Sequence, residues 1–439
     1  MSSNKRVDFV VQPGGKLSGR VRVPGDKSIS HRSVMLGALA EGTTRVTGLL
    51  EGEDVLCTLG AFRAMGVRAQ GPDNGRLVIE GAGLHGLKPP AQALDMGNSG
   101  TAMRLMAGIL AGQKFDSVLV GDESLSKRPM KRVSEPLNSM GAQIETAEGG
   151  RPPLRIAGGR KLQGIHYRLP VPSAQVKSSV LLAGLFAEGE TATTEPAPTR
   201  DHTERMLRGF GYEVAVSGAT ARLRGGRTLR ACDVDVPADI SSAAFFLVGA
   251  SIAPGSDLLL EHVGINPTRI GVLNILRLMG ANIEVTNARE VGGEPVADLR
   301  VRSAPLRGIR IPVDQVPLAI DEFPVLFVAA ACAEGETVLT GAEELRVKES
   351  DRIAVMATGL RRLGIDATET PDGIAIRGGA IAGGEIESHG DHRIAMSFSI
   401  AALRAGGPIV VRDCKNVNTS FPGFAALAQR AGLGVSVQK

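Results

Sequence analysis

Cations and hydrogen-bond donors stand where an apolar helix is expected to begin. The stretch RVPGDKSISHRSVMLGALAEG, residues 22–42, begins as a strand and ends as an apolar helix, and Lys27, Ser28 and Arg32 lie at the start of that helix. The amino end of a helix already carries partial positive charge, so cations there are unfavourable unless solvent or an anion compensates them. The stretch is therefore either a solvated cap or a site for phosphate or carboxylate groups.

Five further helix starts are polar. Their residues are, in chain order, Asn98, Ser99, Gly100 and Arg104; Ser173, Gln175 and Lys177; Asp239, Ser241 and Ser242; Asp321 and Glu322; and His392 and Arg393. Connecting segments add Arg128 in SLSKRPMKR and Arg200 in PTRDHTE. If the six helices are equivalent, their amino ends gather at one end of each domain and form an anion trap in a shared cleft.

The segment RVKESDR, residues 346–352, mixes cations with a carboxylate. On a helix, Lys348 and Arg352 would be four residues apart and would face one way, and Glu349 could form a plain surface ion pair with Arg352. A solvated helix face is therefore the alternative to a site. Asp321 and Glu349 would weaken a site that only binds anions, whereas an enzyme could use them as acid and base.

The chain repeats one pattern six times. Each repeat has a helix that is apolar nearly all round, a short β-branched stretch, and an amphipathic helix that ends in a turn glycine. The six glycines are Gly66, Gly141, Gly211, Gly280, Gly364 and Gly432. We expect an α/β fold in which three repeats close around their apolar helices to form one domain. A doubly wound sheet is the alternative that the pattern leaves open.

The predicted domains are one of residues 1–26 plus 239–439 and one of residues 27–238, with an active site in the cleft between them. The N-terminal strand is expected to pair with the second half of the chain. The boundary between the halves should fall near CDVDVPADI.

Composition restricts the classes of partner. The 439 residues are 43% apolar and 22% charged, with a net charge of +4, which is too mild to indicate nucleic-acid binding. The four cysteines are far apart and form no CxxC pair, so neither a zinc site nor a redox pair is expected. No membrane span and no signal peptide are recognised. We expect a cytoplasmic monomer without a metal or an organic cofactor.

Eight motifs in order resemble one family. They are PGDKSISHR, GNSGTAMR, KRPM, SAQVKS, RDHTE, NPTR, LRVKESDR and DHRIAMS, and they span positions 24–397. Together they resemble the 5-enolpyruvylshikimate-3-phosphate synthases (3-phosphoshikimate 1-carboxyvinyltransferases), and GDKS, SAQVK, RDHTE and NPTR resemble the class II branch. The resemblance implies an inside-out α/β barrel pair of six βαβαββ units.

The resemblance also implies a reaction. The enolpyruvyl group of phosphoenolpyruvate is transferred to the 5-hydroxyl of shikimate 3-phosphate through a tetrahedral intermediate, and phosphate leaves. This reaction belongs to the shikimate pathway of chorismate and aromatic amino-acid biosynthesis. Glyphosate, which resembles phosphoenolpyruvate, is the implied inhibitor.

Site residues follow from the matched motifs. The residues implied in catalysis are Lys27, Asp321, Glu349 and His392. Those implied in binding shikimate 3-phosphate are Lys27, Ser28, Arg32, Ser173, Ala174, Gln175, Arg200, Asp321 and Lys348. Those implied in binding phosphoenolpyruvate are Lys27, Gly100, Arg128, Gln175, Arg352 and Arg393. Two positions depart from the pattern, because Ala174 replaces a frequent serine and Thr419 stands where class I members carry a lysine.

Two other functions compete. A UDP-N-acetylglucosamine enolpyruvyl transferase would share the architecture but normally carries a cysteine or aspartate as its acid on a mobile loop. The matching segment of this chain, GDESLSKRPM, has no cysteine and offers only Asp122. A non-catalytic protein that binds phosphorylated metabolites could use the same cations.

Overall fold

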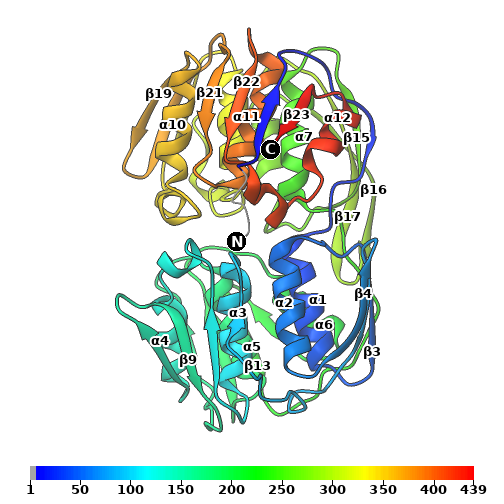
Figure 1. Ribbon diagram of the computed structural model, residues 1–439, viewed down its shortest axis with the longest axis vertical. Coiled ribbons are helices and arrows are strands. Elements are labelled where there is room, and N and C mark those ends of the chain that lie inside the picture. Colours follow the sequence, from blue (N-terminus) through cyan, green and yellow to red (C-terminus); the bar gives the residue numbers. More distant parts are fainter. Residues whose placement is uncertain (1–5) are drawn as a thin grey trace. The chain divides into compact units, whose positions relative to one another are not determined.

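The computed structural model describes residues 6–439 and divides them into two compact units (Figure 1). Unit 1 contains residues 6–24, Pro237–Glu290 and Pro295–Lys439, and unit 2 contains Gly25–Val236 and Val291–Glu294. Compactness alone does not test whether a unit folds as an independent domain. The predicted domain boundaries therefore stay a prediction.

One repeat shows the construction of all six. It contains β6 (Leu94–Asp95), α3 (Gly100–Ala111), β7 (Ser117–Val120), α4 (Lys131–Ser139), β8 (Gln143–Ala147) and β9 (Arg151–Ala157). The strands form a sheet of order β6-β7-β9-β8, in which the β6–β7 pair is parallel and the other pairs are antiparallel. The parallel pair needs a crossover, which α3 supplies.

The rest of unit 2 follows this plan. Its other elements are α1 (Lys27–Leu39), β3 (Thr43–Thr47), α2 (Glu53–Ala64), β4 (Arg68–Asp73), β5 (Arg76–Glu80), β10 (His166–Arg168), α5 (Ala174–Gly184), β11 (Glu190–Thr194), α6 (His202–Gly209), β12 (Ala215–Ser217), β13 (Thr220–Arg224) and β14 (Val234–Asp235). Its further sheets have the orders β14-β3-β5-β4 and β10-β11-β13-β12.

Unit 1 holds the remaining three repeats. Its elements are β1 (Asp8–Val11), β2 (Ser18–Val21), α7 (Ile240–Ile252), β15 (Asp257–Gly264), α8 (Gly271–Leu278), β16 (Asn282–Val291), β17 (Glu294–Arg302), α9 (Phe323–Ala331), β18 (Glu336–Leu339), α10 (Arg352–Arg362), β19 (Asp366–Thr370), β20 (Gly373–Arg377), β21 (Gly384–Glu387), α11 (His392–Ala401), β22 (Ile409–Arg412), α12 (Phe424–Ala431) and β23 (Val435–Gln438). The sheets are β16-β17-β15-β2, β18-β20-β19 and β21-β22-β1-β23.

Two strands are exchanged between the repeats. β2 precedes α1 in the chain but pairs in parallel with β15 of unit 1, and β14 precedes α7 but pairs in parallel with β3 of unit 2. β1 also belongs to unit 1, where it lies between β22 and β23. The expected pairing of the N-terminal strand with the second half of the chain is therefore confirmed.

The six turn glycines end the amphipathic helices. All six have φ between 75° and 116°, with the extremes at Gly211 and Gly432. This left-handed conformation is strained for residues with a Cβ atom, so glycine ends the helix and lets the chain enter the next strand.

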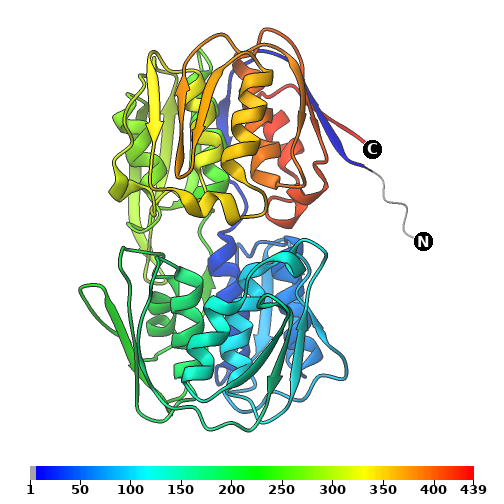
Figure 2. The same cartoon turned by 90° about the vertical axis from the view of Figure 1, so that its left-hand side faces the viewer.

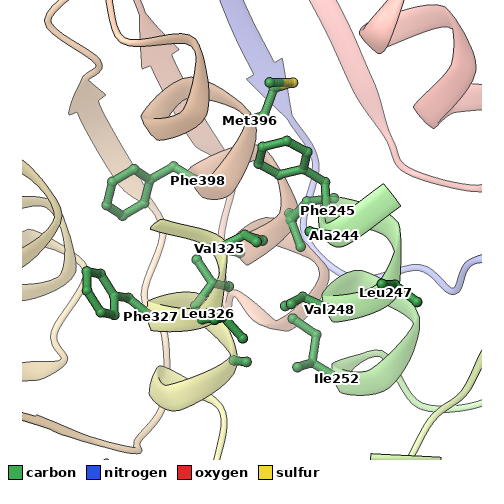
Figure 3. Packing of buried hydrophobic residues seen from close by; sticks show 14 of the residues in the cluster. Ala244, Phe245, Leu247, Val248, Ile252, Val325, Leu326, Phe327, Met396 and Phe398 are labelled. Atoms are coloured by element: carbon green, nitrogen blue, oxygen red, sulfur yellow. The ribbon is translucent and has the colours of Figure 1, made fainter. Parts of the chain in front are cut away.

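The inner helices form the cores. In unit 1, every residue of α7 and α9 is buried, and Phe245, Leu326 and Phe398 bring α7, α9 and α11 together (Figure 3). In unit 2, α1, α3 and α5 share a second core, and Figure 2 shows helices running side by side within the unit. A helix that is apolar nearly all round must be buried in this way, and its polar amino end then becomes the accessible part.

Candidate active site

The inner helices of unit 2 begin with capped amino ends. The side chains of Asp26, Ser99 and Ser173 accept hydrogen bonds from the backbone N–H groups of the first turns of α1, α3 and α5. Each cap satisfies only one of the donors that a helix leaves free at its start. The remaining N–H groups make these ends suitable for an anion.

Lys27 begins α1 and is paired with a buried carboxylate. Its Nζ lies 3.0 Å from Oδ2 of Asp54 in the first turn of α2, and the two side chains are 19% and 8% exposed. The other oxygen of Asp54, Oδ1, has no hydrogen-bond partner within residues 6–439. Asp54 therefore holds the ammonium group at the start of α1, a contact that the sequence analysis missed because the partners are 27 residues apart.

Arg32 lies deeper, in a neutral network. Its Nε donates to Thr203 Oγ1 at 2.7 Å, its Nη2 to Ser178 Oγ at 2.8 Å and its Nη1 to the carbonyl oxygen of Ser28 at 2.9 Å. Burial lowers the pKa of Arg32 to about 10, although the charge of Glu204 opposes the shift. The residue carries buried positive charge with neutral direct partners.

Gln175 connects α5 with α3. Its Oε1 accepts from Arg104 Nη1 at 2.6 Å, and its Nε2 donates to Thr101 Oγ1 at 3.0 Å. A Cβ atom on Gly100 would lie 2.9 Å from Arg104 Nη1 and 3.4 Å from Arg128 Nη1. Gly100 therefore leaves room for two guanidinium groups to approach the start of α3.

Arg128 is held by the loop before α3. Its Nη2 donates to Asn98 Oδ1 at 2.7 Å, and Asn98 Nδ2 donates to Asp122 Oδ2 at 2.7 Å. Asp122 also accepts from the backbone N–H of Leu125 at 2.8 Å. Asp122 therefore orders the loop that carries Arg128. The neighbouring Lys127 is 68% exposed, so its side chain lies in solvent.

The other residues expected for shikimate 3-phosphate also belong to unit 2. Ser173 and Ala174 begin α5, and Arg200 stands two residues before α6. All three are partly exposed, as is Ser28 in the first turn of α1. Ala174 offers no hydroxyl, so any contact with an anion there comes from its backbone.

Arg352 is the centre of the cluster in unit 1. Its guanidinium donates to Asp391 Oδ2 at 2.9 Å, to Glu349 Oε2 at 2.6 Å and to Asp321 Oδ1 at 3.3 Å. The side chain is only 1% exposed. The Arg352–Glu349 pair is therefore part of a buried cluster, and the alternative of a solvated face is wrong.

The charges of this cluster stabilise one another. Burial acts to lower the pKa of Arg352, but the carboxylates of Asp391, Glu349 and Asp321 outweigh it and raise the pKa. Burial likewise acts to raise the pKa of Asp391, but the Arg352 charge holds it below its usual range. Asp391 also caps α11, accepting from the backbone N–H of Arg393 at 2.9 Å.

Lys348 and Arg352 do not share a helix. A short 3₁₀ helix ends at Val347, and α10 begins only at Arg352, because Asp351 caps it by accepting from the N–H of Ala354. The two cations still approach the same carboxylate, because Lys348 Nζ lies 3.8 Å and Arg352 Nη1 lies 3.3 Å from Asp321 Oδ1. Lys348 Nζ also lies 2.9 Å from Glu344 Oε1.

Three expected residues complete the description of unit 1. His392 and Arg393 open α11, and His392 is buried whereas Arg393 is partly exposed. Thr419 is buried, and its hydroxyl donates to the carbonyl oxygen of Asn416 at 2.7 Å. Thr419 therefore supplies no cation.

Further polar residues at the inner helix starts of unit 1 escaped the sequence analysis as a cluster. Arg269 Nη2 donates to Ser241 Oγ at 2.7 Å and to Asp239 Oδ1 at 3.2 Å, and Ser241 donates to Glu322. The sequence analysis named Asp239, Ser241 and Glu322 as polar helix starts, and Arg269 ends the motif NPTR, but it did not predict that these residues contact one another.

Residues 6–439 contain neither a metal-ligand cluster nor a membrane-spanning helix. No group of three or more His, Cys, Asp or Glu side chains there is placed to hold a metal ion. No helix within the same range is long and apolar enough to cross a bilayer. The cysteines are free thiols, and burial raises the pKa of Cys57 to about 11 and that of Cys332 to about 12, which keeps these two protonated.

Unit 2 holds polar helix amino ends beside arginines, which suits the binding of small anions, and unit 1 holds an arginine among carboxylates, which suits acid–base chemistry. A profile described as EPSP synthase (3-phosphoshikimate 1-carboxyvinyltransferase) matches residues 11–427. The 3-phosphoshikimate 1-carboxyvinyltransferase of Methylococcus capsulatus is 67% identical over 434 residues, which are 99% of each chain. The chain belongs to the EPSP synthase family.

Other relatives agree with this assignment. The 3-phosphoshikimate 1-carboxyvinyltransferase of Xanthomonas campestris pv. campestris is 61% identical over 99% of this chain and 100% of its own. The solved structure of EPSP synthase from Acinetobacter baumannii has a TM-score of 0.90 at 61% identity, covering 99% of this chain and 100% of that chain. The enolpyruvyl transferase NikO from Streptomyces tendae, at 17% identity, shares the fold with a TM-score of 0.81.

These findings confirm several predictions. The fold is the α/β fold of EPSP synthases, and the six small mixed sheets fit the expected repeats. The activity is that of a 3-phosphoshikimate 1-carboxyvinyltransferase, a transferase of the shikimate pathway and aromatic amino-acid biosynthesis.

Proposed function

We propose how individual residues of this chain carry out the carboxyvinyl transfer between shikimate 3-phosphate and phosphoenolpyruvate. The helix starts of unit 2 bind the two anionic substrates, and the carboxylates of unit 1 supply the acid and the base. The observation that carries the proposal is the contact of one buried arginine, Arg352, with both Glu349 and Asp321. This contact orients the two carboxylates before a substrate arrives.

Shikimate 3-phosphate is assigned to the starts of α1 and α5. The residues are Lys27, Ser28, Arg32, Ser173, Ala174, Gln175 and Arg200, with Asp321 and Lys348 from unit 1. Arg32 supports the assignment, because its direct partners are neutral and its buried charge gains from an approaching anion. Arginine also suits phosphate and carboxylate groups because its planar fork donates two parallel hydrogen bonds.

Phosphoenolpyruvate is assigned to Lys27, Gly100, Arg128 and Gln175, with Arg352 and Arg393 from unit 1. Arg128 supports the assignment because Asn98 and Ser124 accept hydrogen bonds from its guanidinium and hold it near Gly100 at the start of α3. Arg393 supports it because its side chain makes no ion pair within residues 6–439 and lies in the first turn of α11. Arg352 is already engaged by three carboxylates, so we assign it the positioning of these groups as well.

The reaction requires two opposed proton transfers. Glu349 donates a proton to the methylene carbon of phosphoenolpyruvate, and Asp321 removes the proton of the 5-hydroxyl, whose oxygen adds to the neighbouring carbon. The tetrahedral adduct then loses phosphate and the methyl proton, which restores the carbon–carbon double bond. Lys27 and His392 assist proton movement and stabilise charge at the reacting phosphate. The enol phosphate supplies the driving force, so no cofactor enters a step.

The remaining predictions belong to this proposal. The protein acts as a cytoplasmic monomer, without nucleic acid, membrane or cofactor, and glyphosate competes with phosphoenolpyruvate. The rival transferase would use part of the same cation set, so the test includes its substrate.

The test compares the Michaelis constants of the two substrates. Arg200→Met is expected to raise KM for shikimate 3-phosphate by about 10-fold or more, and Arg128→Met to raise KM for phosphoenolpyruvate by a similar factor, as expected for a lost charge-assisted hydrogen bond. UDP-N-acetylglucosamine should give no phosphate release. Equal effects of both variants on both constants would contradict the assignment, and release with the UDP-sugar would support the rival transferase.

A further inference from the structure

A buried ammonium group lies in unit 2, on the helix that begins with residues assigned to shikimate 3-phosphate. Lys177 lies on α5, two residues after Gln175, and its side chain is 3% exposed. Its Nζ lies 2.9 Å from Glu204 Oε1 and 3.2 Å from Glu195 Oε2. It also donates to the carbonyl oxygen of Thr199 at 3.4 Å. One cation therefore connects α5, α6 and the segment between β11 and α6.

Glu195 continues the network to the residue before Arg200. Its Oε1 accepts from the backbone N–H of Thr199 at 3.1 Å, and its Oε2 accepts from the hydroxyl of Thr199. Lys177 and Glu195 together therefore hold the N–H, the carbonyl oxygen and the hydroxyl of Thr199. The backbone position of Arg200 is consequently fixed by groups that are not expected to touch a substrate.

The charges of this network are balanced by each other. Burial acts to lower the pKa of Lys177, but Glu204 and Glu195 outweigh it and raise the pKa, so the side chain stays charged. The second oxygen of Glu204, Oε2, is buried without a hydrogen-bond partner within residues 6–439, and Glu204 contributes favourably to the charge on Arg32. Removing the ammonium group would leave two buried carboxylates facing each other, which is unfavourable.

The network has a second connection to the same binding residues. Thr203, next to Glu204 on α6, donates to Ser178 Oγ, and both hydroxyls accept from Arg32. α5, which carries Lys177 and Ser178, begins at the residues assigned to shikimate 3-phosphate. A shift of α6 relative to α5 would therefore displace Arg32 and Arg200 together.

We propose that Lys177 is a positioning residue, which with Glu195 and Glu204 fixes Arg200 relative to the start of α5 for the binding of shikimate 3-phosphate. This inference rests on the proposed role of Arg200. It assigns no contact between Lys177 and a substrate. It also distinguishes Lys177 from the other cations at the helix starts, which bind the anions themselves.

The experiment uses the full-length protein and steady-state kinetics in both substrates. Lys177→Met removes the charge at similar length and is expected to raise KM for shikimate 3-phosphate by about 10-fold, with KM for phosphoenolpyruvate changed by less than about 2-fold. Thr199→Val is a milder variant that removes only the hydroxyl donor, and an increase of about 3-fold is expected. It keeps the test valid if Lys177→Met does not fold.

The matched control is Thr191→Val on β11. Thr191 is also fully buried in unit 2, but its hydroxyl has no hydrogen-bond partner within the described residues. Both Michaelis constants of this variant should stay within about 2-fold of the parent, since no positioning contact is lost.

A double variant separates this inference from the proposed function. If Lys177 acts through Arg200, Lys177→Met combined with Arg200→Met should raise KM for shikimate 3-phosphate no further than Arg200→Met alone. An effect of Arg200→Met without any effect of Lys177→Met or Thr199→Val overturns the positioning role and leaves the role of Arg200 intact. Additive effects also overturn it. An Arg200→Met variant with unchanged KM overturns both.

Discussion

Arg352 Nε donates to Asp391 Oδ2 over 2.9 Å, and the exposed fractions of the two side chains are 1% and 0%. The guanidinium belongs to the first residue of α10, and the carboxylate caps α11 (Figure 1). A single buried pair therefore links the amino ends of two helices. The same guanidinium reaches Glu349 and Asp321, so the stability of unit 1 and the orientation of its two acidic groups depend on one side chain.

Replacing Arg352 should therefore be costly. Arg352→Met leaves Asp391 buried without its cation, and we expect a loss of about 3–5 kcal/mol in the free energy of unfolding. The control is Arg300→Met, because Arg300 also donates to a carboxylate, that of Asp257, but is 45% exposed, and its loss should be about 1 kcal/mol or less. Urea unfolding of both variants measures this difference. Similar losses for the two variants would contradict the buried role of Arg352.

Stability should depend on pH through His31. This imidazole is fully buried between Thr58 and Ser99, and burial, followed by the charges of Lys27 and Arg32, holds its pKa well below 6.5. The unfolded chain binds a proton at His31 below about pH 6.5 while the folded chain does not. Stability therefore has no contribution from His31 above that pH and falls as the pH decreases below it, by up to about 1.4 kcal/mol per pH unit.

The variant His31→Asn provides the comparison. Its free energy of unfolding should fall less steeply than that of the parent between pH 6.5 and 5.5, because the titrating group is absent. Denaturant unfolding at pH 7.5, 6.5 and 5.5 measures both slopes. Parallel curves for the two proteins would show that His31 titrates normally in the folded state.

Gly100 should control the access of phosphoenolpyruvate and glyphosate to the start of α3. In Gly100→Ala the new methyl group would lie 2.9 Å from Arg104 Nη1, so that guanidinium must move and its hydrogen bond to Gln175 is disturbed. We expect KM for phosphoenolpyruvate to rise by about 3–10-fold and the inhibition constant of glyphosate to rise by a larger factor. Initial rates with varied inhibitor measure both constants.

A second glycine variant controls for the added methyl group. Gly60→Ala in α2 places its Cβ where no heavy atom lies within 4 Å. Both kinetic constants should remain unchanged, and the helix should gain about 0.5–1 kcal/mol in stability. Equal inhibition constants of glyphosate for Gly100→Ala and the parent would contradict the role of Gly100 in admitting ligands to the start of α3.

The repeat pattern predicted the fold better than the site. The turn glycines and apolar helices are local signals, because a positive φ and a buried face each leave a mark in sequence. The role of Asp391 left no such mark. Its position in DHRIAMS was noted, but its pairing with Arg352 spans 39 residues and depends on tertiary packing.

The predicted helix shared by Lys348 and Arg352 was wrong, and the prediction for Lys27 lacked its partner, because local sequence patterns do not report contacts between segments. The charge pattern around Lys348 and Arg352 suggested a shared helix, but Asp351 caps α10 and ends that possibility. The cationic character of Lys27 was predicted, whereas its carboxylate partner Asp54 was not, because side-chain pairs between helices follow from packing.

The central claim is that Glu349 and Asp321 act as the acid and the base. Separate measurements of substrate binding and of turnover test it most directly. Glu349→Gln and Asp321→Asn keep the size of each side chain but remove the acid or the base, and the rate of phosphate release should fall by about 100-fold or more in each. The control is Glu336→Gln on β18, a carboxylate that pairs with Arg377 at 3.5 Å and is 48% exposed, whose rate should stay within about 2-fold.

The decisive measurement is the affinity for shikimate 3-phosphate of these same variants, determined by titration calorimetry alongside their turnover. The account predicts that Kd changes by less than about 3-fold in Glu349→Gln and by less than about 10-fold in Asp321→Asn, which also weakens a substrate contact, while turnover falls by about 100-fold or more in both, since the helix starts and arginines still bind the anion. If affinity falls in parallel with turnover, or turnover survives both changes, the two carboxylates are not the acid and the base.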